Sequence, residues 1–541
     1  MESLAQDLRV MVRTPLSPAH VEALRAAGEE VTFEPGDLVA RVGEPMDAFF
    51  YVLEGEIEVA DPHTGERRVP STLGPSQFTG EIAFLSGGVN TLPLRACQPT
   101  RALRVDRPVM LDLMAKIPEM SDIIITVYAA RRRRMLEQGN SSLTVIGADA
   151  NRELRRIAAF AGRNRIPLTT LELGSPEARA LCDRLGCSPD KPVVVFGDNQ
   201  VLDAPSPDQI AKLLRLDLAL TCGSVVDVLI VGGGPSGVAA GVYAGAEGLE
   251  ALVVEELAIG GQAGTSSRIE NYMGFPTGIS GADLVWRGEI QAMKFGTHFA
   301  MPRRVTTLSQ DPDGLYKATL DNGVMVGARA IVVATGVQYR RLPLDRLADF
   351  EGAGVYYAAT DTEARYCRDA EVVVIGGGNS AGQAAMFLSR SASHVHVLVR
   401  GNSLAASMSS YLSSRLEADP AITLHYHTEM TALHGADDLN AITVRDKAKG
   451  ETRQMACCAA FIMVGAAPNT GWLSGLVELD AKGFVKTGPD VGQDNPFAAS
   501  RPGVFAVGDV RAGSVKRVAA AVGEGSVVIS KVWEHVNRTR D

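Results

Sequence analysis

The chain has 541 residues, of which 46% are apolar, 6% aromatic and 55 are glycine, a composition typical of three or four α/β domains with many tight turns. Its formal net charge of -10 argues against nucleic acid as the main partner, and no apolar run is long enough to span a membrane. Seven cysteines spread thinly along the chain indicate a reducing, cytoplasmic compartment without structural disulfides.

Residues 1–138 carry short alternating apolar runs broken by Gly and Pro, which predict a small antiparallel barrel followed by a helix over 108–138. The expected strands lie at 30–33, 37–40, 49–53, 56–60 and 101–105. The helix ends in the run Arg131 to Arg134, for which we expect either a solvated face or a contact between domains.

Two stretches of this region, FEPGD at 33–37 with FYVLEGEI at 50–57 and FTGEIAFL at 78–85, resemble the cyclic nucleotide-binding domain. The resemblance makes the second stretch the phosphate-binding cassette and implies that Gly80 and Glu81 would cap the ribose. The position of the arginine that neutralises the cyclic phosphate falls in the sequence VNT at 89–91, so a charge-assisted contact is missing. We therefore favour a degenerate barrel used for packing or dimerisation over a cyclic nucleotide sensor.

Residues 141–218 read as strand 143–146, helix 153–163, strand 167–171, helix 176–185, a strand pair around 197–199 and helix 208–215. This order resembles the thioredoxin-like fold, with Pro192 where that family carries a cis-proline. The loop at 147–150 contains no cysteine, so the resemblance implies the fold without its redox pair. Cys182 and Cys187 are too far apart for a CxxC motif, and we expect them to be core thiols.

The stretch LIVGGGPSGVAAG at 229–241 predicts a dinucleotide-binding turn. A buried strand at 225–231 leads into Gly232, Gly234 and Gly237, which allow a tight turn, close approach of a pyrophosphate and packing of helix on strand. Pro235 and Ser236 open the helix whose N-terminus faces the anion. A second strand at 251–254 ends at Glu255, near the distance expected for a carboxylate that binds a ribose hydroxyl.

From residue 225 to the C-terminus the chain resembles low-molecular-weight thioredoxin reductases. The resemblance rests on IGGQ at 259–262, IENYMGFP at 269–276, ATG at 334–336 and GVFAVGD at 503–509. It implies FAD in the first turn, with the N-terminus of the last helix facing the flavin and stabilising negative charge on it. The further FAD contacts that it implies are Gly261, Gln262, Asn271, Ala334, Thr335, Gly336, Gly508, Asp509, Lys516, Arg517 and Val518.

A second glycine turn follows the strand at 371–375 and contains Gly376, Gly378, Asn379, Ser380 and Ala381. The next strand, at 395–399, ends at Arg400 instead of an acidic residue, which favours NADPH over NADH because a guanidinium attracts the 2′-phosphate. Further arginines of the family pattern are replaced by Gly401 and Ala405, which would weaken the preference for NADPH. Arg415 or Ser403 are the candidates to compensate for these missing arginines.

The family motif with two redox cysteines is absent from its usual place. The sequence VYYAATD at 355–361 puts Ala358 and Asp361 at the two cysteine positions, so no sulfur nucleophile remains there. Cys367 is the nearest thiol. One thiol alone cannot run a dithiol cycle, and we expect Cys367 to be a buried structural residue. Cys457 and Cys458 point to opposite faces of a strand and are also expected to be structural.

The prediction is an α/β chain with two Rossmann-like domains, an NADPH domain (341–466) inserted in an FAD domain (224–340 and 467–541), preceded by the barrel (1–138) and the thioredoxin-like domain (141–218). Hinges of the inserted domain are expected near 337–339 and 465–467. We expect a homodimeric NADPH-dependent flavoprotein, with no metal, that passes electrons to an unidentified small molecule or small redox protein. Two alternatives stay open: a thioredoxin-disulfide reductase that uses Cys367 or an external thiol, and a regulatory flavoprotein that senses a ligand or redox state.

Overall fold

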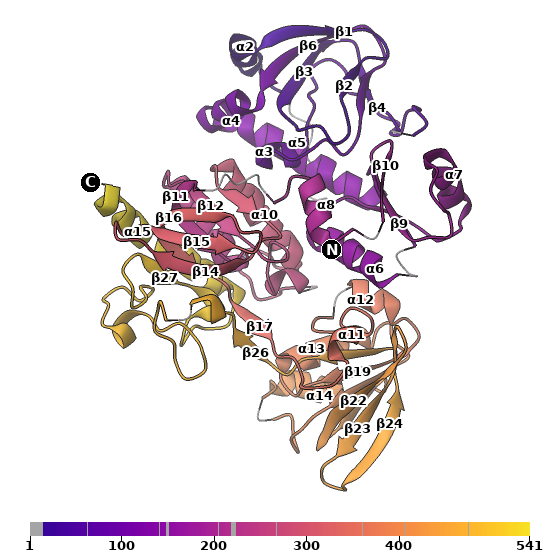
Figure 1. Ribbon diagram of the computed structural model, residues 1–541, viewed down its shortest axis with the longest axis vertical. Coiled ribbons are helices and arrows are strands. Elements are labelled where there is room, and N and C mark those ends of the chain that lie inside the picture. Colours follow the sequence, from indigo (N-terminus) through magenta and orange to yellow (C-terminus); the bar gives the residue numbers. More distant parts are fainter. Residues whose placement is uncertain are drawn as a thin grey trace.

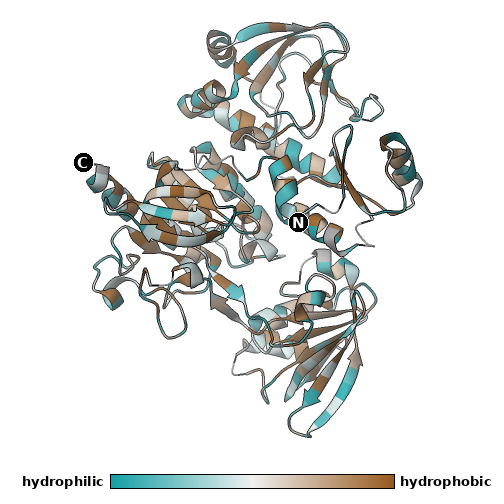
Figure 2. Ribbon diagram, viewed as in Figure 1, coloured by the Kyte–Doolittle hydropathy of each residue, from teal (hydrophilic) through white to brown (hydrophobic). Residues whose placement is uncertain are grey.

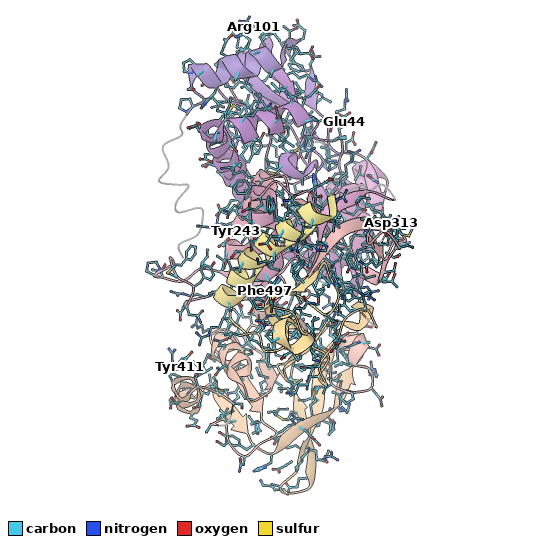
Figure 3. The ribbon with its side chains drawn as sticks, turned by 90° about the vertical axis from the view of Figure 1, so that its left-hand side faces the viewer. Glu44, Arg101, Tyr243, Asp313, Tyr411 and Phe497 are labelled. Atoms are coloured by element: carbon cyan, nitrogen blue, oxygen red, sulfur yellow. The ribbon has the colours of Figure 1, made fainter. Side chains whose placement is uncertain are left out.

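The protein is elongated, with the barrel at one end and the inserted domain at the other (Figure 1). The computed structural model describes residues 15–540 other than 62, 140, 148–150, 204, 218–222, 267, 360, 406 and 474. A view turned by 90° has the same long axis, with Glu44 and Arg101 of the barrel near one end and Tyr411 of the inserted domain towards the other (Figure 3). None of the helices in the described ranges is long and apolar enough to cross a membrane.

The barrel consists of two three-stranded antiparallel sheets, β1-β6-β3 and β2-β5-β4. The expected strands are all present, and β5 was not predicted. Its strands are β1 (Glu29–Phe33), β2 (Leu38–Ala40), β3 (Ala48–Glu54), β4 (Ile57–Val59), β5 (Leu94–Ala96) and β6 (Thr100–Asp106). Its helices are α2 (Pro18–Ala27), α3 (Ala83–Ser86), α4 (Arg107–Lys116) and α5 (Pro118–Gln138).

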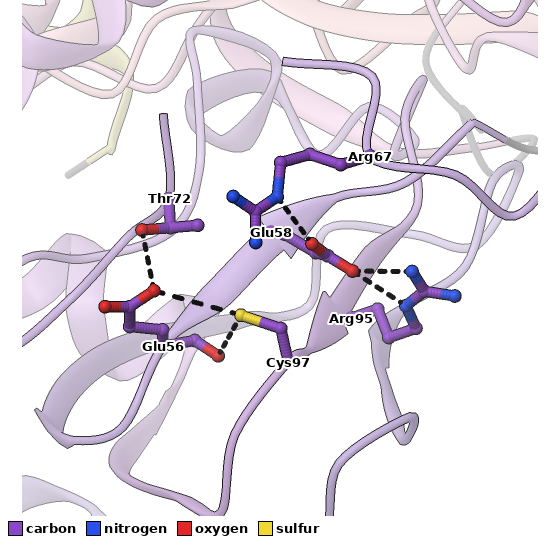
Figure 4. A network of polar contacts seen from close by, with 6 residues as sticks. All are labelled: Glu56, Glu58, Arg67, Thr72, Arg95 and Cys97. Atoms are coloured by element: carbon purple, nitrogen blue, oxygen red, sulfur yellow. Dashed lines mark hydrogen bonds and ion pairs between the residues drawn. The ribbon is translucent and has the colours of Figure 1, made fainter. Parts of the chain in front are cut away.

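A buried carboxylate on β4 is neutralised by the barrel's own arginines (Figure 4). Glu58 is 6% exposed, and its oxygens accept hydrogen bonds from Arg67 Nε at 2.8 Å and Arg95 Nη2 at 2.5 Å. These bonds lower the pKa of Glu58 despite its burial. An unpaired buried charge would cost several kcal/mol, so the three residues stabilise this sheet as a unit.

The middle module, residues 141–217, has the predicted order of elements. Its sheet is β10-β9-β7-β8, in which β7 and β8 are parallel and the other neighbours antiparallel. The elements are β7 (Leu143–Ile146), α6 (Arg152–Arg163), β8 (Thr169–Leu171), α7 (Pro176–Leu185), β9 (Val193–Phe196), β10 (Gln200–Leu202) and α8 (Pro207–Leu213). The assignment to the thioredoxin-like fold stays a prediction, and most of the expected redox loop, at 148–150, lies outside the described residues.

One feature of that prediction is wrong. Pro192 does not follow a cis peptide bond, since the cis bond of the described residues is Met301–Pro302. The likeness at Pro192 is therefore one of position along the chain and not of backbone geometry.

The first Rossmann-like domain has a seven-stranded sheet, with order β13-β12-β11-β16-β15-β14 and β27 paired to β16. Side chains of β11 alternate between two core clusters, Leu229 and Val231 on one face and Val228 and Ile230 on the other. Both faces are thus covered, as parallel strands require, and Figure 2 shows the apolar strands. The strands are β11 (Val225–Val231), β12 (Ala251–Val254), β13 (His298–Ala300), β14 (Val305–Gln310), β15 (Tyr316–Leu320), β16 (Met325–Val333) and β27 (Val504–Ala506). The helices are α9 (Pro235–Ala246), α10 (Gly281–Lys294) and α15 (Val518–Arg540).

The inserted domain has a parallel sheet, β18-β25-β19-β20-β21, and an antiparallel sheet, β22-β23-β24. The antiparallel ribbon of β17 (Val337–Tyr339) and β26 (Ala466–Pro468) joins it to the first Rossmann-like domain, where the two hinges were predicted. Its strands are β18 (Val355–Tyr356), β19 (Glu371–Ile375), β20 (His394–Leu398), β21 (Ile422–His425), β22 (Thr428–Gly435), β23 (Leu439–Asp446), β24 (Glu451–Ala456) and β25 (Ala459–Ile462). Its helices are α11 (Leu347–Phe350), α12 (Asp361–Tyr366), α13 (Asn379–Leu388) and α14 (Ser410–Ala418).

Helix α10 connects the barrel to the first Rossmann-like domain. Its side chains Trp286 and Ile290 are buried in the core cluster of the barrel, and the guanidinium of Arg165 from the middle module lies 4.8 Å from the Trp286 ring centre. Arg165 also pairs with Asp283 on α10 at 2.5 Å. The middle module reaches the inserted domain as well, through Arg155 and Asp438 at 2.9 Å.

Candidate functional site

The first glycine turn lies at the carboxyl end of β11 and is closed by packing at two of its glycines. A Cβ on Gly232 would lie 2.4 Å from the Ala334 carbonyl oxygen, and one on Gly237 would lie 1.8 Å from the Gly232 carbonyl oxygen. At Gly234 a Cβ would meet nothing within 4 Å. The turn is therefore rigid on its protein side and open at Gly234, directly before α9, as a pyrophosphate site requires.

Glu255, at the end of β12, is held against this turn by backbone amides. Its Oε2 accepts from Gly233 N at 2.7 Å, and its Oε1 accepts from Leu257 N at 2.9 Å. Burial raises the pKa of Glu255, and these amide hydrogen bonds oppose that shift. The carboxylate lies where the sequence predicted the ribose-binding acid.

The loop at 259–262 packs against the backbone of the turn at Gly233 and Gly234. Gly260 N donates to Gly233 O at 2.8 Å, and a Cβ on Gly261 would lie 3.1 Å from the Gly234 Cα. The Gln262 side chain donates to the Val337 carbonyl at the start of the ribbon. Asn271, predicted beside Gln262, is exposed and has no hydrogen bond in the described part of the chain.

The ATG segment ties the two parts of the first Rossmann-like domain together. Ala334 N donates to Val231 O at 2.8 Å, and Thr335 Oγ1 donates to Asn469 O at 2.8 Å. Gly336 has a φ of 58°, in the left-handed region that favours glycine. This connection fixes the point from which the chain leaves for the inserted domain.

The segment at 508–518 lies against the N-terminus of α9. A Cβ on Gly508 would lie 2.6 Å from Ser236 Oγ, which brings together two predicted site residues that are far apart in the sequence. Asp509 is half-buried and accepts no hydrogen bond within the described residues. Burial raises the pKa of Asp509, while the charge of Lys516 lowers it.

Two residues that the sequence did not single out support this segment. Glu524 on α15 accepts from Gly508 N at 2.7 Å, and Arg511 Nη2 donates to Glu524 Oε1 at 2.6 Å. A Gly-Asp signature carries no information about a partner on the following helix, so sequence reasoning missed both.

Three further predicted residues lie at the start of α15 or directly before it. Lys516 lies 5.2 Å from the Phe484 ring centre, Arg517 is exposed, and Val518 begins α15.

The second glycine turn repeats the same arrangement in the inserted domain. A Cβ on Gly376 would lie 2.3 Å from the Met463 carbonyl oxygen, whereas one on Gly378 would have no neighbour closer than 3.8 Å. Asn379 and Ser380, at the start of α13, are exposed, and Ala381 is buried against the strand. Asn379 Oδ1 accepts from Ser409 N at 2.8 Å, which fixes the loop before α14.

Arg400 is exposed two residues after the end of β20 and forms no hydrogen bond or ion pair in the described ranges. Arg415 on α14 is also exposed. Ser403 Oγ accepts from Ala405 N at 3.0 Å, so this hydroxyl shapes its own loop. The guanidinium of Arg400 is therefore available for an anion.

Ala358, predicted at the first cysteine position of the family dithiol, is half-buried, and Asp361, predicted at the second, begins α12. Cys367 follows the end of this helix and is 1% exposed. The sequence named no partner thiol for Cys367, and the structure adds one, because this thiol is hydrogen-bonded to that of Cys458. The sequence could not reveal this contact because the two cysteines are brought together only by the parallel sheet. Cys182 and Cys187 are hydrogen-bonded in the same way, with Cys182 in the core of the middle module.

The cassette of the barrel is closed by the chain itself. Arg132 on α5 binds both carboxylate oxygens of Glu81, at 2.7 and 2.8 Å, and Arg131 donates to the Gly80 and Phe78 carbonyls at 2.7 and 2.6 Å. A Cβ on Gly80 would lie 2.4 Å from the buried Tyr128 hydroxyl. Arg132 also donates to Arg165 O in the middle module at 3.0 Å. The arginine run thus makes contacts within the barrel and between domains.

Two family models match separate parts of the chain. Residues 226–525 match the family model described as pyridine nucleotide-disulphide oxidoreductase, and residues 30–117 match that of the cyclic nucleotide-binding domain. Thioredoxin reductases of Treponema pallidum and Streptomyces clavuligerus are 35% and 36% identical, over 58% and 56% of this chain and 97% and 91% of theirs. The crystal structure of Lactococcus lactis thioredoxin reductase aligns with a TM-score of 0.53 at 27% identity, over 58% of this chain and 99% of that one.

Proposed function

The chain belongs to the pyridine nucleotide-disulphide oxidoreductase family, and we propose that it is an NADPH-dependent FAD enzyme whose electrons leave by a route other than a dithiol at the family position. The observation that carries this proposal is the pair of glycine turns, open at Gly234 and at Gly378. They lie on a chain in which we assign Ala358 and Asp361 to the two cysteine positions. The relatives are named thioredoxin reductases, so the two cofactors follow from the family and the acceptor does not.

The residues of the first turn fit FAD. Gly234 offers an open backbone and α9 an N-terminus to a pyrophosphate, and Glu255 offers a carboxylate to a ribose. Asp509 supplies a carboxylate that is free of other hydrogen bonds in the described residues, beside the N-terminus of α15. When bound, FAD would accept hydride from NADPH and pass electrons onward; the protein aligns the two cofactors and excludes water.

Replacing Gly234 with Ala should remove FAD without unfolding the chain. The backbone at Gly234 has φ -71° and ψ -179°, which alanine adopts, and its Cβ would meet no protein atom. The methyl group would instead lie where the pyrophosphate approaches, and loss of such contacts weakens binding by about tenfold to a hundredfold. The measurements are the FAD content of the purified protein and the melting temperature of the apoprotein.

The matched control is Gly162→Ala on the exposed face of α6, where a Cβ also meets nothing within 4 Å. It should retain FAD. Full FAD content in Gly234→Ala would mean that the first turn does not bind the pyrophosphate.

Replacing Arg400 with Glu should shift the enzyme from NADPH toward NADH. A carboxylate at the end of β20 repels the 2′-phosphate and accepts a ribose hydroxyl, so kcat/KM for NADPH should fall by about tenfold to a hundredfold. Stopped-flow reduction of the flavin with each nucleotide measures this change. Arg390→Glu, beyond the other end of α13, makes the same charge change away from the turn and should leave the preference unaltered. A native enzyme that uses NADH as well as NADPH would contradict the role given to Arg400.

The acceptor is tested by reducing the holoenzyme anaerobically with NADPH and adding one oxidant at a time. The candidates are a quinone, dioxygen, a ferredoxin-like carrier and an external disulfide docked by the middle module. We expect the reduced flavin to be reoxidised by one of the first three at least as fast as by thioredoxin disulfide. Faster reoxidation by the disulfide would favour the alternative of a thioredoxin-disulfide reductase.

For the barrel we propose a structural role in place of ligand sensing. Glu81, which would bind a ribose, is already paired with Arg132, and Tyr128 fills the space above Gly80. The shared core with α10 gives the barrel a packing function instead. The domain boundaries given above, a cytoplasmic location and a homodimer complete the proposal.

A further inference from the structure

Cys367 and Cys458 meet inside the inserted domain although 90 residues of chain separate them. Cys367 follows α12 and is 1% exposed, whereas Cys458 precedes β25 and is half-buried. Both pack in one core cluster, and a hydrogen bond joins the two thiols. Ala370 N donates to Cys367 O at 3.3 Å and Cys458 N donates to Glu371 O at 3.1 Å, which holds the loop 367–371 against the strand.

The two thiols differ in the way that an attacking and a resolving cysteine differ. The hydrogen bond from Cys367 lowers the pKa of Cys458, and the same bond together with burial raises the pKa of Cys367. The half-buried Cys458 thiol is the one that a small oxidant reaches first, and the buried neighbouring thiol then captures the product. The adjacent Cys457, also in the connection between β24 and β25, lies in a different core cluster, where burial raises its pKa to about 12.

We propose that Cys367 and Cys458 form a redox modification site, which a hydroperoxide converts to an intramolecular disulfide. The Cys458 thiolate attacks the O–O bond of hydrogen peroxide, which gives a sulfenic acid and hydroxide. The Cys367 sulfur then attacks the Cys458 sulfur, forming the S–S bond and releasing the second oxygen as water. In total, two thiols lose two electrons and two protons, and one peroxide becomes two waters.

The disulfide would fasten the carboxyl end of α12 to the residue directly before β25. The family dithiol is predicted at Ala358 and at Asp361, the other end of the same helix, so this site is distinct from the family dithiol. Its oxidation does not depend on whether the first turn binds FAD.

The test is peptide mapping of the full-length holoenzyme after treatment with hydrogen peroxide. Remaining thiols are alkylated, and the peptides are compared by mass spectrometry with and without dithiothreitol. We expect a cross-linked peptide that contains Cys367 and Cys458, two hydrogens lighter than the sum of its parts, which disappears on reduction. Peroxide treatment that leaves both thiols alkylatable, or that oxidises Cys458 to a sulfinic acid without a link, would overturn the proposal.

Matched variants assign the link to one of the two adjacent cysteines. Cys457→Ser should retain the cross-link, and Cys458→Ser should lose it and leave Cys367 alkylatable after denaturation. A cross-link that persists in Cys458→Ser would contradict the assignment. The mapping of the native protein stands without the variants, so a variant that fails to fold leaves the test intact.

Discussion

The double variant Ala358→Cys/Asp361→Cys should gain NADPH-dependent disulfide reductase activity. The sequence predicts that these positions correspond to the two cysteines of the family motif, and Asp361 begins α12 in the described structure. A thiolate at a helix N-terminus is stabilised by the helix dipole, so a dithiol here would be nucleophilic. We expect turnover of an aromatic disulfide to rise about tenfold or more above the native chain, measured by NADPH oxidation and release of the coloured thiolate.

The control for this experiment is Ala358→Ser/Asp361→Ser, which changes the same positions without adding sulfur. Each single cysteine variant should stay near the native rate, because one thiol cannot close a dithiol cycle. The series is repeated with Cys367→Ser to remove any contribution of the native pair. A native enzyme that already turns over the disulfide as fast as the double variant would show that the missing motif is not what redirects its electrons.

The sequence predicted the cofactor turns well because their geometry is local. Gly232, Gly234 and Gly237 lie within six residues, and steric demands on a tight turn appear directly as glycines. The positions of Glu255 and Arg400 follow in the same way, since each comes after a strand at a fixed distance from its turn, and their roles toward a cofactor stay predictions. For Glu255 the structure adds the partner atoms, such as the Gly233 amide.

Contacts between distant segments could not be predicted in this way. The pairing of Glu81 with Arg132 joins the cassette to a helix 51 residues later, and nothing in the arginine run indicates which carboxylate it meets. Cys458 is the partner of Cys367 only because α12 and β25 pack on one core. Such pairs depend on tertiary packing, which composition and periodicity do not encode for single residues.

Arg303 is a buried charge that the sequence also did not indicate. Its side chain is 1% exposed, Nη2 lies 2.6 Å from the Asp217 carboxylate of the middle module, and Nη1 donates to Pro302 O. Its Nε has no hydrogen-bond partner among the residues that the structure describes. The backbone amide of Arg303 donates to Glu255 O at 2.8 Å, so this ion pair supports the strand end that carries the predicted ribose-binding acid.

Removing the partner of this charge, with Asp217→Ala, should destabilise the first Rossmann-like domain by about 3–5 kcal/mol. The reason is that the guanidinium would remain buried without a counterion, and the loop at 301–304 would shift to hydrate it. Because that loop holds the Glu255 backbone, FAD affinity should fall together with stability. Thermal unfolding and FAD titration of the full chain measure the two effects.

Two variants separate the buried charge from the loss of any surface carboxylate. Asp208 lies 3.9 Å from the same guanidinium but has a side chain 56% exposed, so Asp208→Ala should change stability by less than about 1 kcal/mol. The pair Asp217→Leu/Arg303→Met removes both charges and should recover most of the loss, since apolar replacements of buried ion pairs are often neutral or stabilising. If Asp217→Ala unfolds at the temperature of Asp208→Ala, the ion pair does not support the site, and the position of Glu255 must depend on its amide hydrogen bonds alone.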